Sequence, residues 1–222
     1  MTLFIASKPQ LWSCPFAWSV WFSRLIGEVM KIVAMMVMAV VIEIGARADD
    51  VTVYVNDPSV VPARQLIRAQ VLANEIFASV GVKIDWRQYK PSPSLSRPEG
   101  SVFVEMLSNA PRRRMPKAVA FAVPDAGGHI TVFYDRIKEA AQFELTSNPL
   151  LAHVLVHEIA HILQGNAKHS DGGIMKATWS QKDIRAMRWR PLPFGEEDVQ
   201  SIRAGLAERA DAQLAISVYP DP

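Results

Sequence analysis

One segment, residues 148–164, is apolar around most of a helical circumference, which is the pattern of a buried helix. Asn148 is a good N-cap residue, Pro149 suits the first helical position, and Gly165 favours an end to the helix. The apolar residues of the segment are Leu150, Leu151, Val154, Leu155, Val156, Ile159, Ile162 and Leu163. Unpaired polar groups are costly in such surroundings, so the polar residues in the second half of the segment need a chemical explanation.

Those polar residues form the sequence His157-Glu158-Ile159-Ala160-His161. The two histidines are four residues apart and therefore lie on one face of the helix, one turn apart, where both can bind the same zinc ion. Zinc lowers the pKa of a water molecule that it binds toward about 7, and Glu158 is placed to accept the proton of that water. The arrangement is the H-E-x-x-H pattern of zinc hydrolases. The alternative is a pair of core histidines that bind no metal.

A catalytic zinc ion usually has three protein ligands and one open position. His169 is the predicted third ligand, because Gly165 lets the chain turn back toward the helix. His153 lies one turn before His157, but three ligands in a row on one straight helix would span about 12 Å, so it is predicted to be a core or supporting histidine. Other candidates for the third ligand are Asp171, Glu196, Glu197 and Asp198.

The remainder of the chain after Asp49 predicts strands first and helices later. β-rich or alternating segments predict strands at 51–55, 82–86, 101–107, 118–123 and 129–134. Helical patterns occur between Pro62 and Gly81, at 135–144 and at 196–209, and residues 165–195 are expected to be irregular. This order predicts an α+β domain with about five strands and a loop-rich C-terminal part that ends in a helix.

The distribution of charge argues against nucleic acid as a partner. Of the 24 basic and 22 acidic residues, four basic and two acidic ones lie in residues 1–48, which leaves 20 of each sign from Asp49 onward. A neutral domain has no electrostatic footprint for nucleic acid. The basic residues at 112–114 and Lys117 are interpreted as a solvated loop.

Residues 30–48 resemble a secretory signal peptide. Lys31 precedes a short run, 32–44, that is apolar except for Glu43, and Ala46-Arg47-Ala48 follows as a small-x-small cleavage pattern. The chain is therefore expected to be secreted or periplasmic. The alternative is a single membrane anchor, which would make the membrane a partner only if residues 30–48 are retained.

This interpretation divides the chain into four parts. Residues 1–29 are an N-terminal extension, which need not be translated if synthesis begins at Met30, and residues 30–48 are the signal peptide. The zinc-binding α+β domain is predicted to span residues 49–210, and residues 211–222 form a C-terminal tail. The single cysteine, Cys14, lies in the extension, so cysteine ligands for the predicted zinc ion are excluded.

The segment from His157 to Ser170 resembles the metzincin clan of zinc peptidases, whose pattern is H-E-x-x-H-x-x-G-x-x-H followed by a methionine turn. Gly173-Ile174-Met175 is similar to that turn, and the resemblance makes Met175 the methionine beneath the metal. Further similarity to matrix-metalloprotease-like members lies in 120–124, 127–128 and 133–135, and to the start of their last helix in 194–199 with Ile202. The third-histidine spacing is a variant, because the glycine and histidine follow His161 by four and eight residues instead of three and six.

The resemblance implies a zincin-like, metzincin-like α+β fold, with a five-stranded mixed sheet over two long helices and the active-site helix at the floor of a cleft. A peptide or protein substrate would lie antiparallel to an edge strand within 118–123, at Ala120, Phe121 and Ala122. The predicted activity is hydrolysis of peptide bonds with one catalytic zinc ion and with Glu158 as the general base. The alternative is an extracytoplasmic zinc-binding module with little or no catalysis, and the presence of Glu158 favours the peptidase.

Overall fold

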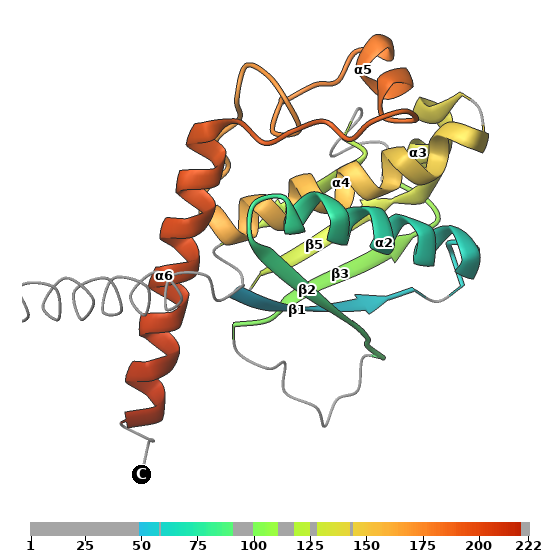
Figure 1. The fold of residues 1–222 in the computed structure, drawn as a ribbon. Helices are drawn as coiled ribbons and strands as arrows, with labels where there is room; N and C mark the ends of the chain where they lie inside the picture. Colours follow the sequence, from blue (N-terminus) through green and yellow to red (C-terminus); the bar gives the residue numbers. More distant parts are fainter. Residues whose placement is uncertain are drawn as a thin grey trace, which may run out of the picture. The chain divides into compact units, whose positions relative to one another are not determined.

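The computed structural model describes residues 49–57, 59–90, 100–110, 118–124, 128–142 and 144–218. The described elements, in chain order, are β1 (Asp49–Asn56), α2 (Ala63–Ala78), β2 (Val82–Gln88), β3 (Val102–Leu107), β4 (Ala120–Val123), β5 (His129–Phe133), α3 (Tyr134–Ala141), α4 (Glu144–Gln164), α5 (Gln181–Ala186) and α6 (Glu196–Val218) (Figure 1). The predicted signal peptide, the N-terminal extension and the basic cluster at 112–117 lie outside the described residues.

The strands form one five-stranded mixed sheet in the order β2-β1-β3-β5-β4. β1 pairs in parallel with β2 and β3, and β3 pairs in parallel with β5. β4 is antiparallel to β5, with Ala120 opposite Val132 and Ala122 opposite Ile130. β4 therefore forms one edge of the sheet, and the predicted α+β class with a five-stranded mixed sheet is confirmed.

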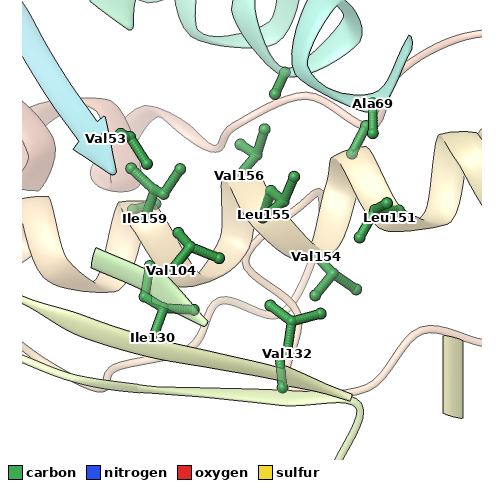
Figure 2. Packing of buried hydrophobic residues seen from close by; sticks show 14 of the residues in the cluster. Val53, Ala69, Val104, Ile130, Val132, Leu151, Val154, Leu155, Val156 and Ile159 are labelled. Atoms are coloured by element: carbon green, nitrogen blue, oxygen red, sulfur yellow. The ribbon is translucent and has the colours of Figure 1, made fainter. Parts of the chain in front are cut away.

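One face of the sheet packs against two helices. Alternate residues of the central strands point to this face, as Val53, Val104, Ile130 and Val132 illustrate, and all four are buried. Figure 2 shows three of them, on β3 and β5, below the apolar side chains of α4, while Ala69 approaches the same helix from α2. α4 is thus enclosed by the sheet on one side and by α2 on the other, which explains why it is apolar nearly all round.

The prediction that α4 begins at Asn148 and Pro149 is wrong, because the helix begins at Glu144 and contains Pro149 in its interior. The buried Asn148 Oδ1 has no hydrogen-bond partner among the described residues, so this side chain does not cap the helix. Pro149 is the sixth residue of this helix, beyond the first four amide groups, so it removes one amide that would otherwise donate within the helix.

Two helices of the C-terminal part also differ from the expectation. α5 lies within the segment expected to be irregular, and Ser180 and Asp183 form a capping box at its start. α6 continues past the predicted end at Arg209 as far as Val218. None of the described helices combines the length and the apolar character that a membrane span requires.

α4 and α6 approach each other closely at Gly205. A Cβ atom at this position would lie 1.9 Å from the carbonyl oxygen of Leu163, and a backbone atom cannot rotate away. We therefore expect Gly205→Ala to lower the free energy of unfolding by about 1–3 kcal/mol through overpacking, as measured by urea denaturation. Gly172→Ala is the matched control, because a Cβ atom there meets nothing within 4 Å. Equal stability of the two variants would contradict the close contact of the helices.

Candidate metal centre

Three histidines predicted from the sequence come together at the C-terminal half of α4. His157 and His161 lie on the helix and are buried, whereas His169 lies in the loop that follows and is exposed. Each offers one ring nitrogen to a group whose ligand atoms all lie within 4.8 Å of one another. The ring centroids are 4.6 to 5.3 Å apart. The three side chains can therefore hold a metal ion.

Hydrogen bonds fix the tautomers of the two helical histidines. The Nδ1 atom of His157 lies 2.9 Å from the carbonyl oxygen of Ile174, and the Nδ1 atom of His161 lies 3.1 Å from that of Asn166. A carbonyl oxygen only accepts hydrogen bonds, so Nδ1 carries the proton in both rings. In the neutral rings, each Nε2 atom is then left with a lone pair.

The two Nε2 atoms lie 3.1 Å apart and face each other. Neither can donate to the other, so two lone pairs meet at close range, an arrangement that a cation between them would stabilise. Zinc–nitrogen bonds of about 2.0–2.1 Å at a tetrahedral angle place two ligand nitrogens about 3.3 Å apart. The donor set and the spacing of His157 and His161 therefore fit zinc.

Burial keeps these two imidazoles neutral. It lowers the pKa of His157 to about 4, against the opposing effect of its hydrogen bond to Ile174. Burial also lowers the pKa of His161, and the neighbouring His169 adds to this effect. Neutral imidazole is the form that binds a metal ion.

The loop that carries His169 is anchored at both ends. At its start, the amide of Asn166 donates to the carbonyl oxygen of His161, and the Asn166 side chain accepts from the amide of Lys168. At its end, the amide of Ser170 donates to the carbonyl oxygen of Met175, and the Ser170 hydroxyl donates to the carboxylate of Asp198 on α6. Relative to the metzincin spacing, one extra residue lies before Gly165 and the other lies between Gly165 and His169, so only the second falls between these anchors.

The carboxylates considered as third ligands lie outside the group of histidines. Asp171, Glu196 and Glu197 are exposed, the last two in the first turn of α6. Asp198 is buried, but its oxygens accept hydrogen bonds from Ser170 and from the amide of Gly195. Asp198 thus holds the loop of His169, a role that no pattern in the sequence indicates.

Met175 belongs to a tight turn next to the first histidine. Gly173 has a φ of 68°, and a Cβ atom there would lie 2.3 Å from the carbonyl oxygen of Pro193, so the turn requires glycine. Ile174 follows, and its carbonyl oxygen is the partner of His157. Met175 is fully buried. The turn therefore orients His157, and the role of Met175 beneath a metal ion stays a prediction.

Glu158 lies between the sheet edge and the histidines. Its side chain is buried, which raises the pKa to about 7, and a backbone hydrogen bond from Ala122 of β4 opposes this shift. A carboxyl group with such a pKa can both accept and release a proton near neutral pH.

A cavity of about 410 Å³ opens beside these side chains. Its polar lining comes from Glu158, His157, His169, Lys176, Thr178 and Gln181. Much of the remaining wall is apolar and comes from β4 and its approach, α4 and α5: Ala118, Val119, Ala120, Leu150, Val154 and Ile184. The site thus places a titratable carboxyl group beside a space that is partly apolar.

Trp179 is a residue of this site that sequence reasoning missed. Its ring lies edge-on to His157 with centroids 5.5 Å apart, and it also lines the cavity. Its buried Nε1 atom has no hydrogen-bond partner among the described residues. Nothing in the sequence distinguishes it from the other tryptophans, because its position depends on the turn that precedes α5.

The two remaining histidines lie elsewhere. His153 is a core histidine: its Nδ1 donates to the carbonyl oxygen of Pro149 at 2.7 Å, and its Nε2 accepts from the amide of Leu192 at 3.0 Å. His129 does not line the cavity beside Glu158. It projects from the opposite face of the sheet, where its Nε2 atom lies 3.7 Å from the carboxylate of Glu105.

His153 makes stability depend on pH. Burial lowers its pKa from 6.5 to about 4, so between these values the unfolded chain binds a proton that the folded chain excludes. Its contribution is complete above pH 6.5 and is lost as pH falls toward 4. In chelator-treated wild-type protein, the free energy of unfolding is expected to fall between about pH 7.5 and about pH 5. We expect this fall to be about 2 kcal/mol smaller in His153→Gln. Urea denaturation at both pH values measures this, and an unchanged pH dependence would contradict it.

Comparison with known proteins finds a structural likeness without a sequence match. No protein-family model and no curated protein matches the chain. Among solved structures, the chain is similar to the crystal structure of an archaemetzincin from Methanopyrus kandleri. The two share 13% identity over 72% of this chain and 97% of that chain, with a TM-score of 0.49. A likeness of this degree says nothing about activity, so the function of this chain has to be inferred from its own side chains.

Proposed function

We propose that this chain is an exported, metzincin-like zinc metallopeptidase. The observation that carries the proposal is the convergence of His157, His161 and His169 beside the buried carboxyl of Glu158, at the wall of a partly apolar cavity. A purely structural metal site has no use for an ionisable carboxyl of this kind or for an adjoining cavity.

The proposed mechanism assigns a separate task to each side chain. The three histidines hold one zinc ion, and the carbonyl oxygens of Ile174 and Asn166 keep two of the rings in the required tautomer. Zinc, when bound, supplies Lewis-acid activation of water and of the substrate carbonyl group. Glu158 accepts a proton as water adds to the carbonyl carbon, and donates it to the amine nitrogen as the peptide bond breaks.

β4 supports a peptide or protein as the substrate. It is an edge strand, and its inner neighbour β5 occupies only one of its two sides. A peptide can pair with the other side of Ala120, Phe121 and Ala122 by strand addition. The backbone of Ala122 also contacts Glu158, so a peptide on this edge lies next to the proposed base. The cavity then favours an apolar side chain beside the bond that is cleaved.

The alternative function is an extracytoplasmic zinc-binding module without catalysis. The two functions are separated by measuring the zinc content of the purified chain together with hydrolysis of a broad peptide library. One zinc ion per chain with hydrolysis supports the peptidase. One zinc ion per chain without any hydrolysis would replace it by the module.

We further propose that cleavage after Ala48 releases a domain that begins at Asp49. The cleavage pattern 46–48 motivates this, and the position of Asp49 as the first residue of β1 supports it, because the cut leaves the sheet intact. N-terminal sequencing or intact mass of exported protein is expected to give a chain that starts at or near Asp49. Recovery of a membrane-bound chain that retains residues 30–48 would favour the anchor instead.

A further inference from the structure

α5 and the helical turn after it present a basic face with a tryptophan. Lys182, Arg185, Arg188 and Arg190 are all exposed, and Trp189 has 82% of its surface exposed. The amides of Trp189 and Arg190 both donate to the carbonyl oxygen of Ala186, so the helical path continues beyond the end of α5. We refer to these five residues as the basic face.

The basic face points away from the core. Ile184 and Met187 are 6% and 2% exposed and anchor this segment to the domain. Lys182, Arg185 and Trp189 follow the spacing i, i+3, i+7, which puts them together on the opposite side of the helical path, with Trp189 near the middle. The guanidinium of Arg188 lies 5.3 Å from the centroid of the Trp189 ring.

The four cations of this face have no acidic partner among the described residues. Asp183 is the single acidic residue between Gln181 and Arg190. Its carboxylate already pairs with Lys176 at 2.7 Å and accepts from the amide and hydroxyl of Ser180. Since residues 49–222 carry equal numbers of basic and acidic residues, the basic face is a local concentration of charge within a neutral domain.

We propose that the basic face binds the surface of an anionic phospholipid bilayer. Tryptophan is enriched at the level of lipid headgroups because its ring is apolar and its N–H is polar, and the surrounding cations are complementary to lipid phosphates. Charged residues are depleted at the cores of protein–protein interfaces, whereas four cations around one ring match a surface of phosphates. Gln181 and Ile184 of α5 also line the cavity beside Glu158, so binding through this face brings that cavity close to the bilayer.

The test is co-sedimentation of the full chain with vesicles of phosphatidylcholine alone or with added phosphatidylglycerol. Binding to neutral vesicles measures any contribution of the apolar run at 32–44. The increase in binding when phosphatidylglycerol is added measures the contribution of the basic face. We expect Arg185→Glu with Arg188→Glu to lower the partition into anionic vesicles by at least about 25-fold, since each cation near such a surface contributes about fivefold. Trp189→Ala is expected to weaken binding as well.

The matched control is Arg64→Glu with Arg203→Glu, which makes the same change in net charge at exposed positions on α2 and α6. It is expected to change the partition by less than about threefold. Equal losses of partition into anionic vesicles in the two double variants would overturn the proposal, because they would indicate that the net charge of the chain, and not the basic face, drives binding. The proposal would also be overturned if added phosphatidylglycerol did not increase the partition into vesicles. Displacement of the chain from vesicles by polyglutamate at matched charge would overturn it in favour of an acidic protein partner. Zinc content is expected to stay unchanged throughout, so this outcome is separate from that of the peptidase.

Discussion

Replacement of Glu158 by glutamine is expected to reduce peptide hydrolysis by at least about 100-fold while zinc content stays near that of the wild type. In the proposed mechanism this carboxyl moves a proton, and it is not one of the three side chains that converge as candidate metal ligands. General-base assistance typically contributes about 10²–10⁴-fold to the rate. Glutamine has nearly the same shape and can still accept the hydrogen bond from Ala122, so the packing between α4 and β4 is preserved.

The measurement is kcat/KM on a cleaved library peptide, with metal analysis and thermal unfolding of the same samples. Glu105→Gln is the matched control, because it makes the same carboxyl-to-amide change on the sheet face opposite α4 and outside the cavity. If both variants keep full activity, the base lies elsewhere and the mechanism proposed here is wrong.

Replacement of His157 or His161 by alanine is expected to abolish stoichiometric zinc binding. Loss of a partner that only supports a ligand already lowers metal affinity by about 10–100-fold, so loss of a ligand is expected to exceed about 100-fold. Competition with a chromophoric chelator measures the affinity, and metal analysis after gel filtration measures the stoichiometry. His129→Ala is the control, since this histidine lies on the other face of the sheet and is expected to leave zinc binding intact.

His169→Ala is the most informative of these variants. Its side chain is exposed and comes from a loop, so its role depends on the loop's anchors at Asn166 and Ser170. We expect its loss to reduce affinity as much as the loss of a helical ligand. Unchanged affinity would remove His169 from the ligand set and return attention to Asp171 and the acids at 196–198.

Much of the fold could be predicted because its signals are local. The strands of the sheet and the enclosed helix α4 follow from hydrophobic patterns, and the pairing of His157 with His161 follows from helical geometry alone. His169 also reaches the position expected for it, while its binding of metal stays a prediction.

The parts that could not be predicted depend on contacts between distant segments. The partner of Asp198 is Ser170, on a loop 28 residues away, and the partner of His153 is an amide 39 residues away. No periodicity signals such contacts. α5 is a different case: its capping box, Ser180 with Asp183, was readable in the sequence, but the surrounding glycine, tryptophan and proline residues obscured it.

The anchoring of the loop between His161 and His169 has a consequence for how such sites are recognised. The imidazole of His161 and the carboxylate of Asp198 hold the loop at Asn166 and Ser170, and the nitrogens of His157 and His161 face each other 3.1 Å apart although the loop is two residues longer than the metzincin pattern. A text pattern with fixed gaps records the length of a loop and not the contacts that hold its two ends. A spatial query for two imidazoles with carbonyl-bound Nδ1 atoms beside an enclosed carboxyl describes what the chemistry requires, and it would retrieve chains that any fixed-gap expression passes over.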